Sequence, residues 1–286
     1  MTKNNDVPSE HIVNRIVRAA LEEDLGAIGD ITSAAVIPET STSAGSLVAR
    51  EQGVIAGLEI GLRVFEIFDS SIEIKAHVSD GDSVQANTVL ARIDGPTRSL
   101  LAAERTCLNL LGHLSGIATA TAQLVERISH TSARIIDTRK TTPGLRSLEK
   151  YAVVMGGGAN HRFGLYDAIL IKDNHLATTG NVAATIKKAR KSVGHAVTIQ
   201  IEVDNLEQLE QAINAGADSV LLDNMDVEKM TRAVTVSRER VVLEASGGIT
   251  ETTVAGIAET GVNFISVGAL THSSPSFDVA LDFDTI

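Results

Sequence analysis

The feature that most constrains this chain is a repeated unit in its C-terminal half. Three stretches are self-similar, namely GLYDAILIKDN from Gly164, GADSVLLDN from Gly216 and GVNFISVGA from Gly261. In each, a glycine that can end a helix precedes a short polar stretch, an apolar strand and a polar or glycine turn. The interval of about 45 to 55 residues is long enough for a complete βα unit with its loops. This half of the chain is therefore predicted to form a parallel α/β sheet.

Three more strand signals extend the repeat. They are Ile135–Ile136, Thr198–Val203 and Val241–Ala245. The helix after the third strand is well delimited, since Asn205 can cap its start and Gly216 can end it. About six strands are fewer than the eight of the complete barrel. We therefore expect an incomplete, roughly six-stranded α/β barrel.

The N-terminal part has a different pattern. Ser9–Leu25 reads as an amphipathic helix and Gly57–Phe68 as a second one, with short strand signals between Ser46 and Ile93. Pro96 is expected to open a long helix. These elements predict an N-terminal α/β sandwich over residues 1–115, joined by 275–286, with the barrel over 116–274. The segment HVSDGDSVQANTVLARIDG resembles a lipoyl-carrier hairpin, but no lysine stands at its tip, and we interpret it as scaffold.

Composition argues against several classes of protein function and location. The formal net charge is −11 and aromatic residues make up 3%, which argues against nucleic-acid binding. The single cysteine, Cys107, excludes an intrachain disulfide, and no Cys/His cluster has zinc-site spacing. No apolar run approaches the ~18 residues of a membrane span, and the polar N-terminus lacks the apolar core of a signal peptide. We expect a cytoplasmic protein that buries its core in water.

The ends of the predicted strands carry a common kind of residue. Each strand is followed by, or ends in, charged residues or glycine: Thr138, Arg139 and Lys140; Lys172; Glu202; Asp223; Ser246, Gly247 and Gly248; Gly268 and Ala269. In parallel α/β sheets the ligand site lies at the carboxyl ends of the strands. Solvated surface residues are the plainer interpretation of any one of these groups. The same layout at six strands favours a functional rim.

The residue types at this rim indicate an anionic ligand. Arg139, Lys140, Arg162 and Lys172, with His161 as a further member, would form a cationic basin suited to several carboxylates or phosphates. The turn at Ser246–Gly248, with a helix start expected from Ile249, can offer backbone N–H groups to a phosphate. Glu202 and Asp223 could meet a Mg²⁺–phosphate complex or sugar hydroxyls. No Ser-His-Asp set or G-x-S-x-G elbow is present, so acyl chemistry is unsupported.

The long helix that begins near Pro96 has two lines of residues. An apolar line includes Cys107, which we interpret as an inert core thiol. A second line is made of small or polar residues, namely Ala102, Arg105, Asn109, Gly112 and Gly116. Small residues let another helix approach closely, so this line is a candidate subunit contact. For Arg105 the alternative is an ordinary surface ion pair with Glu104.

Several motifs together resemble one enzyme family. They are DTRKTTPGLR, EKYAVVMGGGANHRFGLYDAILIKDNH, IEVDN, LLDNM, EASGGI and VGALTHS, with EDLGAIGDIT and ERTCLNLLGHLSGIAT upstream. This set resembles the quinolinate phosphoribosyltransferase family over nearly the whole chain. The resemblance implies an N-terminal sandwich, an incomplete barrel and an assembly that is at least dimeric. It also implies a transferase that converts quinolinate and phosphoribosyl pyrophosphate, with Mg²⁺, into nicotinate mononucleotide, CO₂ and pyrophosphate for NAD biosynthesis.

The resemblance also implies roles for single residues. Arg105 would be lent to the neighbouring subunit of a homodimer or larger assembly. Catalysis would rest on Lys140, Lys172, Glu202 and Asp223, the two acids also contacting ribose or metal. Quinolinate and pyrophosphate would be held by Arg105, Arg139, Lys140, His161, Arg162 and Lys172. The remaining substrate contacts would come from Thr138, Ser246, Gly247, Gly248, Val267, Gly268 and Ala269. His272 lies near this rim, though a solvated loop histidine is its plainer reading.

Two other functions remain open from the sequence. One is a related phosphoribosyltransferase-like enzyme that acts on another acid. The other is a non-catalytic carrier or scaffold built on the lipoyl-like segment. A preference for the dicarboxylate over nicotinate would exclude the first, and the absence of a covalent modification would exclude the second.

Overall fold

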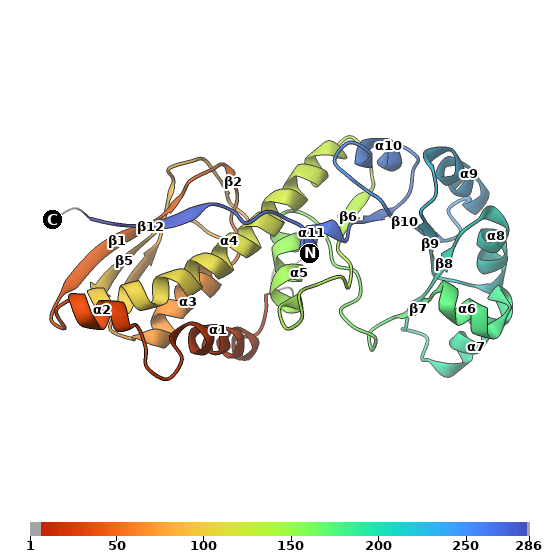
Figure 1. Cartoon of the computed structure of the whole chain (residues 1–286). Helices are drawn as coiled ribbons and strands as arrows, with labels where there is room; N and C mark the ends of the chain where they lie inside the picture. The colour runs from red at the N-terminus through yellow and green to blue at the C-terminus, as the bar shows by residue number, and fades with distance from the viewer. Residues whose placement is uncertain (1–6, 285–286) are drawn as a thin grey trace. The chain divides into compact units, whose positions relative to one another are not determined.

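Two units with different sheet types make up the described chain, residues 7–284, of this computed structural model (Figure 1). The first unit contains the described residues up to Ala122, together with Thr141–Gly157 and the residues from Leu270 onward. The second unit contains Gln123–Lys140 and Gly158–Ala269. The division falls within the long helix α4 (Thr97–Arg127). This α/β architecture, with an antiparallel sheet and a parallel sheet, confirms the predicted fold class.

The first unit is built on an antiparallel sheet. Its strands lie in the order β12-β1-β5-β3, so the C-terminal strand pairs with the first strand of the chain. The strand bounds are β1 (Thr42–Ala49), β3 (Glu73–Ala76), β5 (Val89–Pro96) and β12 (Val279–Phe283), with the separate pair β2 (Gly53–Val54) and β4 (Ser83–Val84). The helices are α1 (Glu10–Leu25), α2 (Ile31–Val36), α3 (Leu58–Phe68), α4 and α5 (Arg146–Met155). Pro96 ends β5, and the predicted long helix begins one residue later.

The small residues of α4 have a role that differs from the predicted subunit contact. A Cβ atom on Gly116 would lie 2.0 Å from the carbonyl oxygen of Pro275, and one on Gly112 would lie 2.9 Å from that of Phe277. The N–H of Phe277 also donates to the carbonyl of Gly112 at 2.9 Å. At these two positions the prediction was wrong, because the chain's own C-terminal segment occupies the groove. Cys107 on the other line is buried, and burial raises the pKa of its thiol, as expected for an inert core cysteine.

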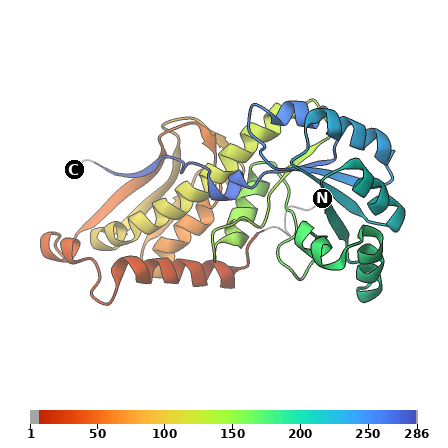
Figure 2. The ribbon, with the colours of Figure 1, turned by 45° about the vertical axis from the view of Figure 1, so that its right-hand side comes forward.

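The second unit is a six-stranded parallel sheet in the order β6-β11-β10-β9-β8-β7. The strands are β6 (Arg134–Ile136), β7 (Ile169–Ile171), β8 (Ile199–Val203), β9 (Ser219–Asp223), β10 (Val242–Ser246) and β11 (Phe264–Ser266). The two edge strands, β6 and β7, are consecutive in the chain, so the sheet is open between them. Helices α6 (Asp173–Thr179), α7 (Val182–Ser192), α8 (Leu206–Ala215), α9 (Val227–Ser237), α10 (Val254–Ala258) and the short α11 (Ala269–His272) follow the strands (Figure 2).

The alternation of residues along these strands explains which face carries the site. Ile199, Ile201 and Val203 of β8 are fully buried, whereas Gln200 and Glu202 lie between them in the sequence and so point to the opposite face. The register pairs Glu202 with Leu221 and Leu221 with Glu244, which places these side chains at one level of the same face. The apolar face packs under the helices, and the other face presents polar groups.

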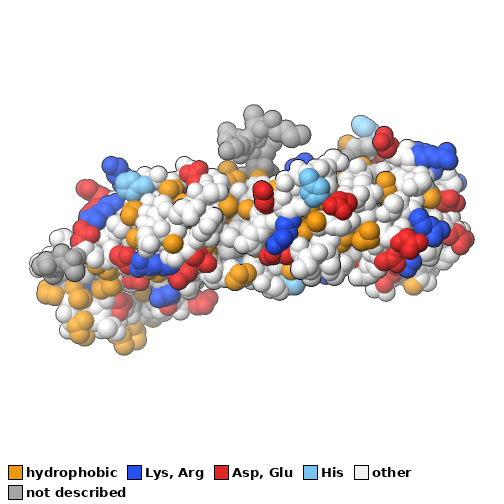
Figure 3. Space-filling view, turned by 90° about the horizontal axis from the view of Figure 1, so that it is seen from above, with side chains coloured by type: hydrophobic (Ala, Val, Ile, Leu, Met, Phe, Trp, Pro, Cys, Tyr) orange, Lys and Arg blue, Asp and Glu red, His pale blue; other side chains and the backbone are white. Residues whose placement is uncertain are grey.

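The surface of the described residues carries no single-sign patch in the view of Figure 3, where acidic and basic side chains are interspersed. Arg92 and Asp284 form a solvent-accessible ion pair, and pairs of this kind add little to stability. Among residues 7–284, none of the helices combines the length and the apolar character that crossing a membrane requires.

Candidate active site

The segment after α5 brings two distant parts of the motif together at the free edge of β6. The N–H of Ala159 donates to Ile135 O at 2.9 Å, and the N–H of Asp137 donates to Ala159 O at 3.2 Å. Residues from Gly158 onward therefore extend the sheet beside β6 for a short distance. This pairing sets His161 and Arg162 next to Asp137 and the residues that follow it.

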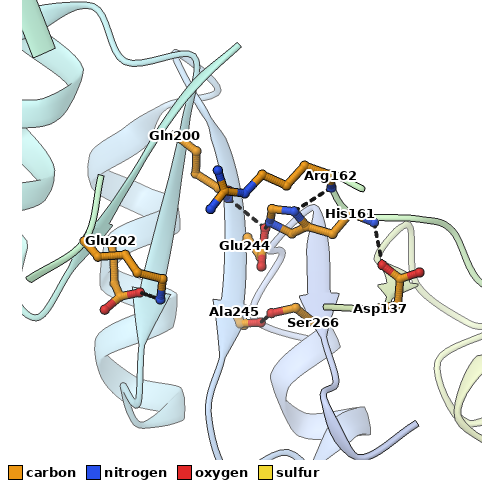
Figure 4. Close-up of polar contacts among 9 residues, drawn as sticks. Asp137, His161, Arg162, Gln200, Glu202, Glu244, Ala245 and Ser266 are labelled. Atoms are coloured by element: carbon orange, nitrogen blue, oxygen red, sulfur yellow. Dashed lines mark hydrogen bonds and ion pairs between the residues drawn. The ribbon is translucent and has the colours of Figure 1, made fainter. Parts of the chain in front are cut away.

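His161 lies at the centre of a buried polar network in the second unit (Figure 4). Its main-chain N–H donates to Asp137 Oδ1 at 2.8 Å, and its Nδ1 accepts the main-chain N–H of Arg162 at 2.7 Å. Its Nε2 lies 3.3 Å from Glu244 Oε2, which also accepts the Gln200 amide at 2.7 Å. Asp137 is fully buried and Glu244 is 3% exposed. The network thus runs from β6 through His161 to β10 and β8.

Arg139 and Arg162 form the cationic part of the site. Burial, and then the positive charge of Arg139, lower the pKa of Arg162 below its ordinary value, so Arg139 acts on Arg162 as a like-charged neighbour. Arg162 Nη1 donates to the carbonyl of Ala168 at 2.8 Å, which holds one end of the group. The Nε atoms of both arginines are buried and have no hydrogen-bond partner among the described residues. Two adjacent cations with unused donors favour a doubly charged anion as their ligand.

A short turn stabilises the chain just beyond Arg162. The carboxylate of Asp167 accepts the N–H groups of Phe163 at 2.7 Å and Gly164 at 3.0 Å. Burial tends to raise the pKa of Asp167, but these backbone hydrogen bonds outweigh it, and the net pKa lies below the usual value. Asp167 therefore holds this turn in its ionised form.

Lys172 and Glu202 form an ion pair at the other edge of the sheet. Lys172 Nζ lies 2.7 Å from Glu202 Oε2; the lysine side chain is 47% exposed and the glutamate 11%. The N–H of Lys172 donates to His175 Nδ1 at 2.9 Å, which orients the backbone at the end of β7. The sequence placed both residues at the rim but did not predict that they pair with each other.

Asp223 and the glycine turn complete the rim on β9 and β10. Asp223 pairs in register with Ser246 and accepts the side-chain amide of Asn224 at 2.7 Å. Gly247 has φ +97°, and a Cβ there would lie 2.1 Å from Asn224 Oδ1, so only glycine fits. The helix expected from Ile249 instead begins at Val254. This correction leaves the N–H groups of the turn itself, rather than a helix N-terminus, as the candidate anion donors.

The other predicted site residues are distributed as follows. Thr138 Oγ1 accepts the N–H of Lys140 at 3.0 Å, which keeps both residues at the end of β6. Val267 is buried and its N–H donates to Ile136 O at 3.0 Å, which places Gly268 and Ala269 at the end of β11. Gly248 continues the glycine turn with φ +61°. His272 is exposed at the end of α11, where its Nδ1 lies 2.6 Å from Ser273 Oγ.

Arg105 belongs to the first unit. It is exposed on α4 and makes no hydrogen bond or ion pair to another described residue beyond its electrostatic contact with Glu104. This exposure is compatible with either interpretation made from the sequence.

The carboxylates of the second unit do not form a closed metal cage. No cluster of three or more His, Cys, Asp or Glu side chains suited to a metal ion occurs within residues 7–284. Glu202 is neutralised by Lys172, and Asp223 keeps only one side-chain amide contact.

Three residues of the network escaped sequence analysis as individual candidates, namely Asp137, Gln200 and Glu244. The available signal was the alternation within the strands IQIEV and VLEAS, where one or two polar residues interrupt buried apolar ones. A buried strand with a charged residue at its centre indicates an interior polar partner.

Comparisons with known proteins cover most of both units. Residues 30–115 match the family model described as quinolinate phosphoribosyl transferase, N-terminal domain, and residues 117–282 match the corresponding C-terminal domain. The chain is 45% identical over 260 residues to a probable nicotinate-nucleotide pyrophosphorylase [carboxylating] of Bacillus subtilis, covering 91% of this chain and 89% of that protein. It is 44% identical to the nicotinate-nucleotide pyrophosphorylase [carboxylating] of Mycobacterium leprae, with 93% and 95% covered.

A solved structure gives the same result for the fold. The nicotinate-nucleotide pyrophosphorylase of Francisella tularensis superposes with a TM-score of 0.94 at 42% identity, covering 99% of this chain and 100% of that one.

Proposed function

Since this chain belongs to the quinolinate phosphoribosyltransferase family, we propose that it transfers the phosphoribosyl group of phosphoribosyl pyrophosphate to quinolinate with loss of CO₂. The products are nicotinate mononucleotide, CO₂ and pyrophosphate, as in de novo NAD biosynthesis. The observation that carries the proposal is the pair of adjacent guanidinium groups, Arg139 and Arg162, with buried Nε donors that have no partner among the described residues. Quinolinate has two adjacent carboxylates, and this arrangement matches them.

We propose that the two substrates are held largely by different strands of the rim. Arg139, Arg162, Lys140 and Lys172 at the ends of β6 and β7 would hold quinolinate and the pyrophosphate. The N–H groups of the turn at Ser246–Gly248 and of Gly268 would hold the 5′-phosphate, since barrel phosphate sites are often built by the last strand-end loops. The ribose would then lie near Glu202 and Asp223, which share one face of the sheet.

The chemistry follows from this placement. The ring nitrogen of quinolinate attacks ribose C1 while the bond from C1 to pyrophosphate breaks. Glu202 and Asp223 oppose the positive charge that develops at C1. The pyridine nitrogen becomes cationic when it is alkylated, and it stabilises the electron pair left at ring C2 when CO₂ departs. A proton then replaces the carboxylate, and the protein contributes mainly orientation and fixed charge.

Arg105 and the assembly are part of the same proposal. Arg105 would reach the site of a neighbouring copy in a homodimer or larger assembly, and its exposure on α4 without a strong partner supports this role. We propose a cytoplasmic location on the basis of the family resemblance.

The product assay tests the proposed function. The purified protein is incubated with phosphoribosyl pyrophosphate and either quinolinate or nicotinate, and nicotinate mononucleotide and CO₂ are measured. We expect a strong preference for quinolinate, because nicotinate lacks the second carboxylate that the arginine pair would bind. Equal rates with both acids, or no CO₂ released with quinolinate, would contradict the proposal.

Metal removal provides a separate test. We propose that Mg²⁺ enters with phosphoribosyl pyrophosphate, offsets the charge of the leaving pyrophosphate and contacts Glu202 or Asp223. Chelation with EDTA is expected to abolish turnover, and added Mg²⁺ to restore it. The thermal unfolding temperature should not change, because the protein has no closed metal cage among its described residues. Full activity in EDTA would exclude this role.

A further inference from the structure

The buried carboxylate of Glu244 has no assigned part in the proposed reaction. It lies on β10, 3% exposed, on the polar face of the sheet. Burial tends to raise the pKa of Glu244, but its hydrogen bond and electrostatic contact with His161, followed by hydrogen bonds from Ser266 and Gln200, outweigh it, so that the net pKa lies below its usual value. An ionised carboxylate in the interior is costly unless its partners compensate. The hydrogen bonds that keep Glu244 ionised in the interior therefore indicate a functional role for this residue.

The hydrogen bonds of Glu244 determine how the His161 ring is held. One oxygen, Oε2, receives both donors, from Gln200 at 2.7 Å and from His161 Nε2 at 3.3 Å. An ionised carboxylate can only accept, so Nε2 must carry the proton. Nδ1 is then the acceptor for the N–H of Arg162 at 2.7 Å, as observed. The two contacts require the same tautomer and support each other.

His161 is fixed from two directions. Asp137 on the β6 side accepts its main-chain N–H at 2.8 Å, and Glu244 on β10 holds its ring. The ring in turn fixes the N–H of Arg162, and Figure 4 shows Arg162 beside this network. The backbone at Arg162 is therefore constrained by groups from two strands that are not neighbours in the sheet.

We propose that Glu244, supported by Gln200, is a positioning residue that acts through His161 to orient Arg162 toward the carboxylates of the substrate. The identity of the substrate in this inference rests on the proposed function, whereas the hydrogen-bonded geometry around Glu244 does not. Glu244 touches no reacting atom in this scheme. Its effect should be larger on the binding of quinolinate than on that of phosphoribosyl pyrophosphate, since the ribose and 5′-phosphate of the latter are assigned to β8 to β11.

A double-mutant cycle tests the path through His161. Glu244→Leu removes the acceptor and is expected to raise the KM for quinolinate by about 10- to 100-fold, because small displacements of a binding group have effects of this size. The KM for phosphoribosyl pyrophosphate should rise less, because its ribose and 5′-phosphate are bound by other residues. In a His161→Ala background, Glu244→Leu should add no further increase, since both changes break one path. Independent, multiplying effects, or an unchanged KM for quinolinate in folded Glu244→Leu, would overturn the proposal.

Conservative and matched variants separate positioning from general destabilisation. Glu244→Gln can place its amide oxygen where Oε2 stands and accept both donors, so most of the affinity for quinolinate should return. Ser219→Ala changes another buried polar residue of the same sheet and should leave both KM values unchanged. If Glu244→Gln is no better than Glu244→Leu, or if Ser219→Ala raises the KM for quinolinate equally, positioning through His161 is wrong.

The tautomer of His161 can be read in the wild-type protein. Long-range ¹H–¹⁵N NMR spectra, assigned by comparison with His161→Ala, are expected to show a neutral ring protonated at Nε2. A ring protonated at Nδ1 would contradict the network even if every variant failed to fold. This measurement is independent of activity. A protein that makes no product from quinolinate but shows the Nε2-protonated ring would refute the proposed function and leave the network intact.

Discussion

Replacement of Lys172 by alanine is expected to lower turnover with quinolinate by about 10²- to 10³-fold, the size of effect seen when one group that stabilises charge in the transition state is removed. Lys172 Nζ lies 2.7 Å from Glu202 at the end of β7, in the proposed site of charge transfer. Removal of Lys172 deletes a cation from the basin and also leaves Glu202, 11% exposed, without its counter-charge. Arg139→Ala should cause a loss of similar size, because it removes one of the two adjacent guanidinium groups.

The measurement is steady-state release of nicotinate mononucleotide at saturating substrates. Lys188→Ala is the matched control, since Lys188 is exposed on α7 and has no assigned role. The control should retain wild-type turnover. Near wild-type turnover in both Lys172→Ala and Arg139→Ala would show that the cationic basin is not the site of the reaction.

Gly116→Ala is expected to have the largest effect on stability among single methyl additions. The new Cβ would lie 2.0 Å from the carbonyl oxygen of Pro275 and 3.1 Å from its carbonyl carbon, both of them backbone atoms that no rotamer change can move. Overpacking of this kind costs about 1–3 kcal/mol or more in the free energy of unfolding. That loss exceeds the gain of about 0.5–1 kcal/mol expected when alanine replaces glycine within a helix.

Denaturant unfolding provides the test, with Gly256→Ala as control. Gly256 lies inside α10, and a Cβ there would meet no atom within 4 Å. The control should therefore be neutral or slightly more stable than the wild type. If Gly116→Ala is as stable as Gly256→Ala, the C-terminal segment does not cross α4 as described.

The parallel sheet was largely predictable because its signals are local. Each predicted strand is a short apolar run preceded by a helix-ending glycine or polar turn. Strands β8 and β10 begin and end within one residue of the prediction, and β7, β9 and β11 lie inside the three self-similar stretches. The helix after β8 begins after the predicted cap, Asn205, whose side chain accepts the N–H of Gln208 at 3.0 Å. The delayed start of α10 was missed because three threonines after Gly248 form hydrogen-bonded turns among themselves.

The subunit contact predicted along α4 depended on a packing partner that local sequence patterns do not encode. Gly112 and Gly116 do permit close approach, as small residues should, but the sequence could not say what approaches. The C-terminal segment is more than 150 residues away in the chain and has no pattern that pairs it with these glycines. Close packing between such distant segments is decided only when the sheet of the first unit closes through β12 and β1.

The candidate site likewise has one part that the sequence predicts and one part that only the structure shows. Residue types and their places at strand ends were readable, because the carboxyl ends of parallel strands meet at one rim whatever the details. The side-chain partners of these residues could not be predicted from the sequence. The pairing of Lys172 with Glu202, and the network of Asp137, His161 and Glu244, depend on the order of strands in the sheet, which hydrophobic periodicity does not encode.

The sequence by itself determined the fold class, the approximate strands of the parallel sheet and the cationic character of its rim, since these follow from periodicity, glycine punctuation and residue type. The tertiary structure alone decided that α5 packs with the first unit, that the C-terminal segment fills the small-residue groove of α4, and that Glu244 holds His161. The physical reason is the range of the interactions. Helix caps and strand alternation act over a few residues, whereas a buried hydrogen bond forms only where folding brings distant donors and acceptors within about 3 Å.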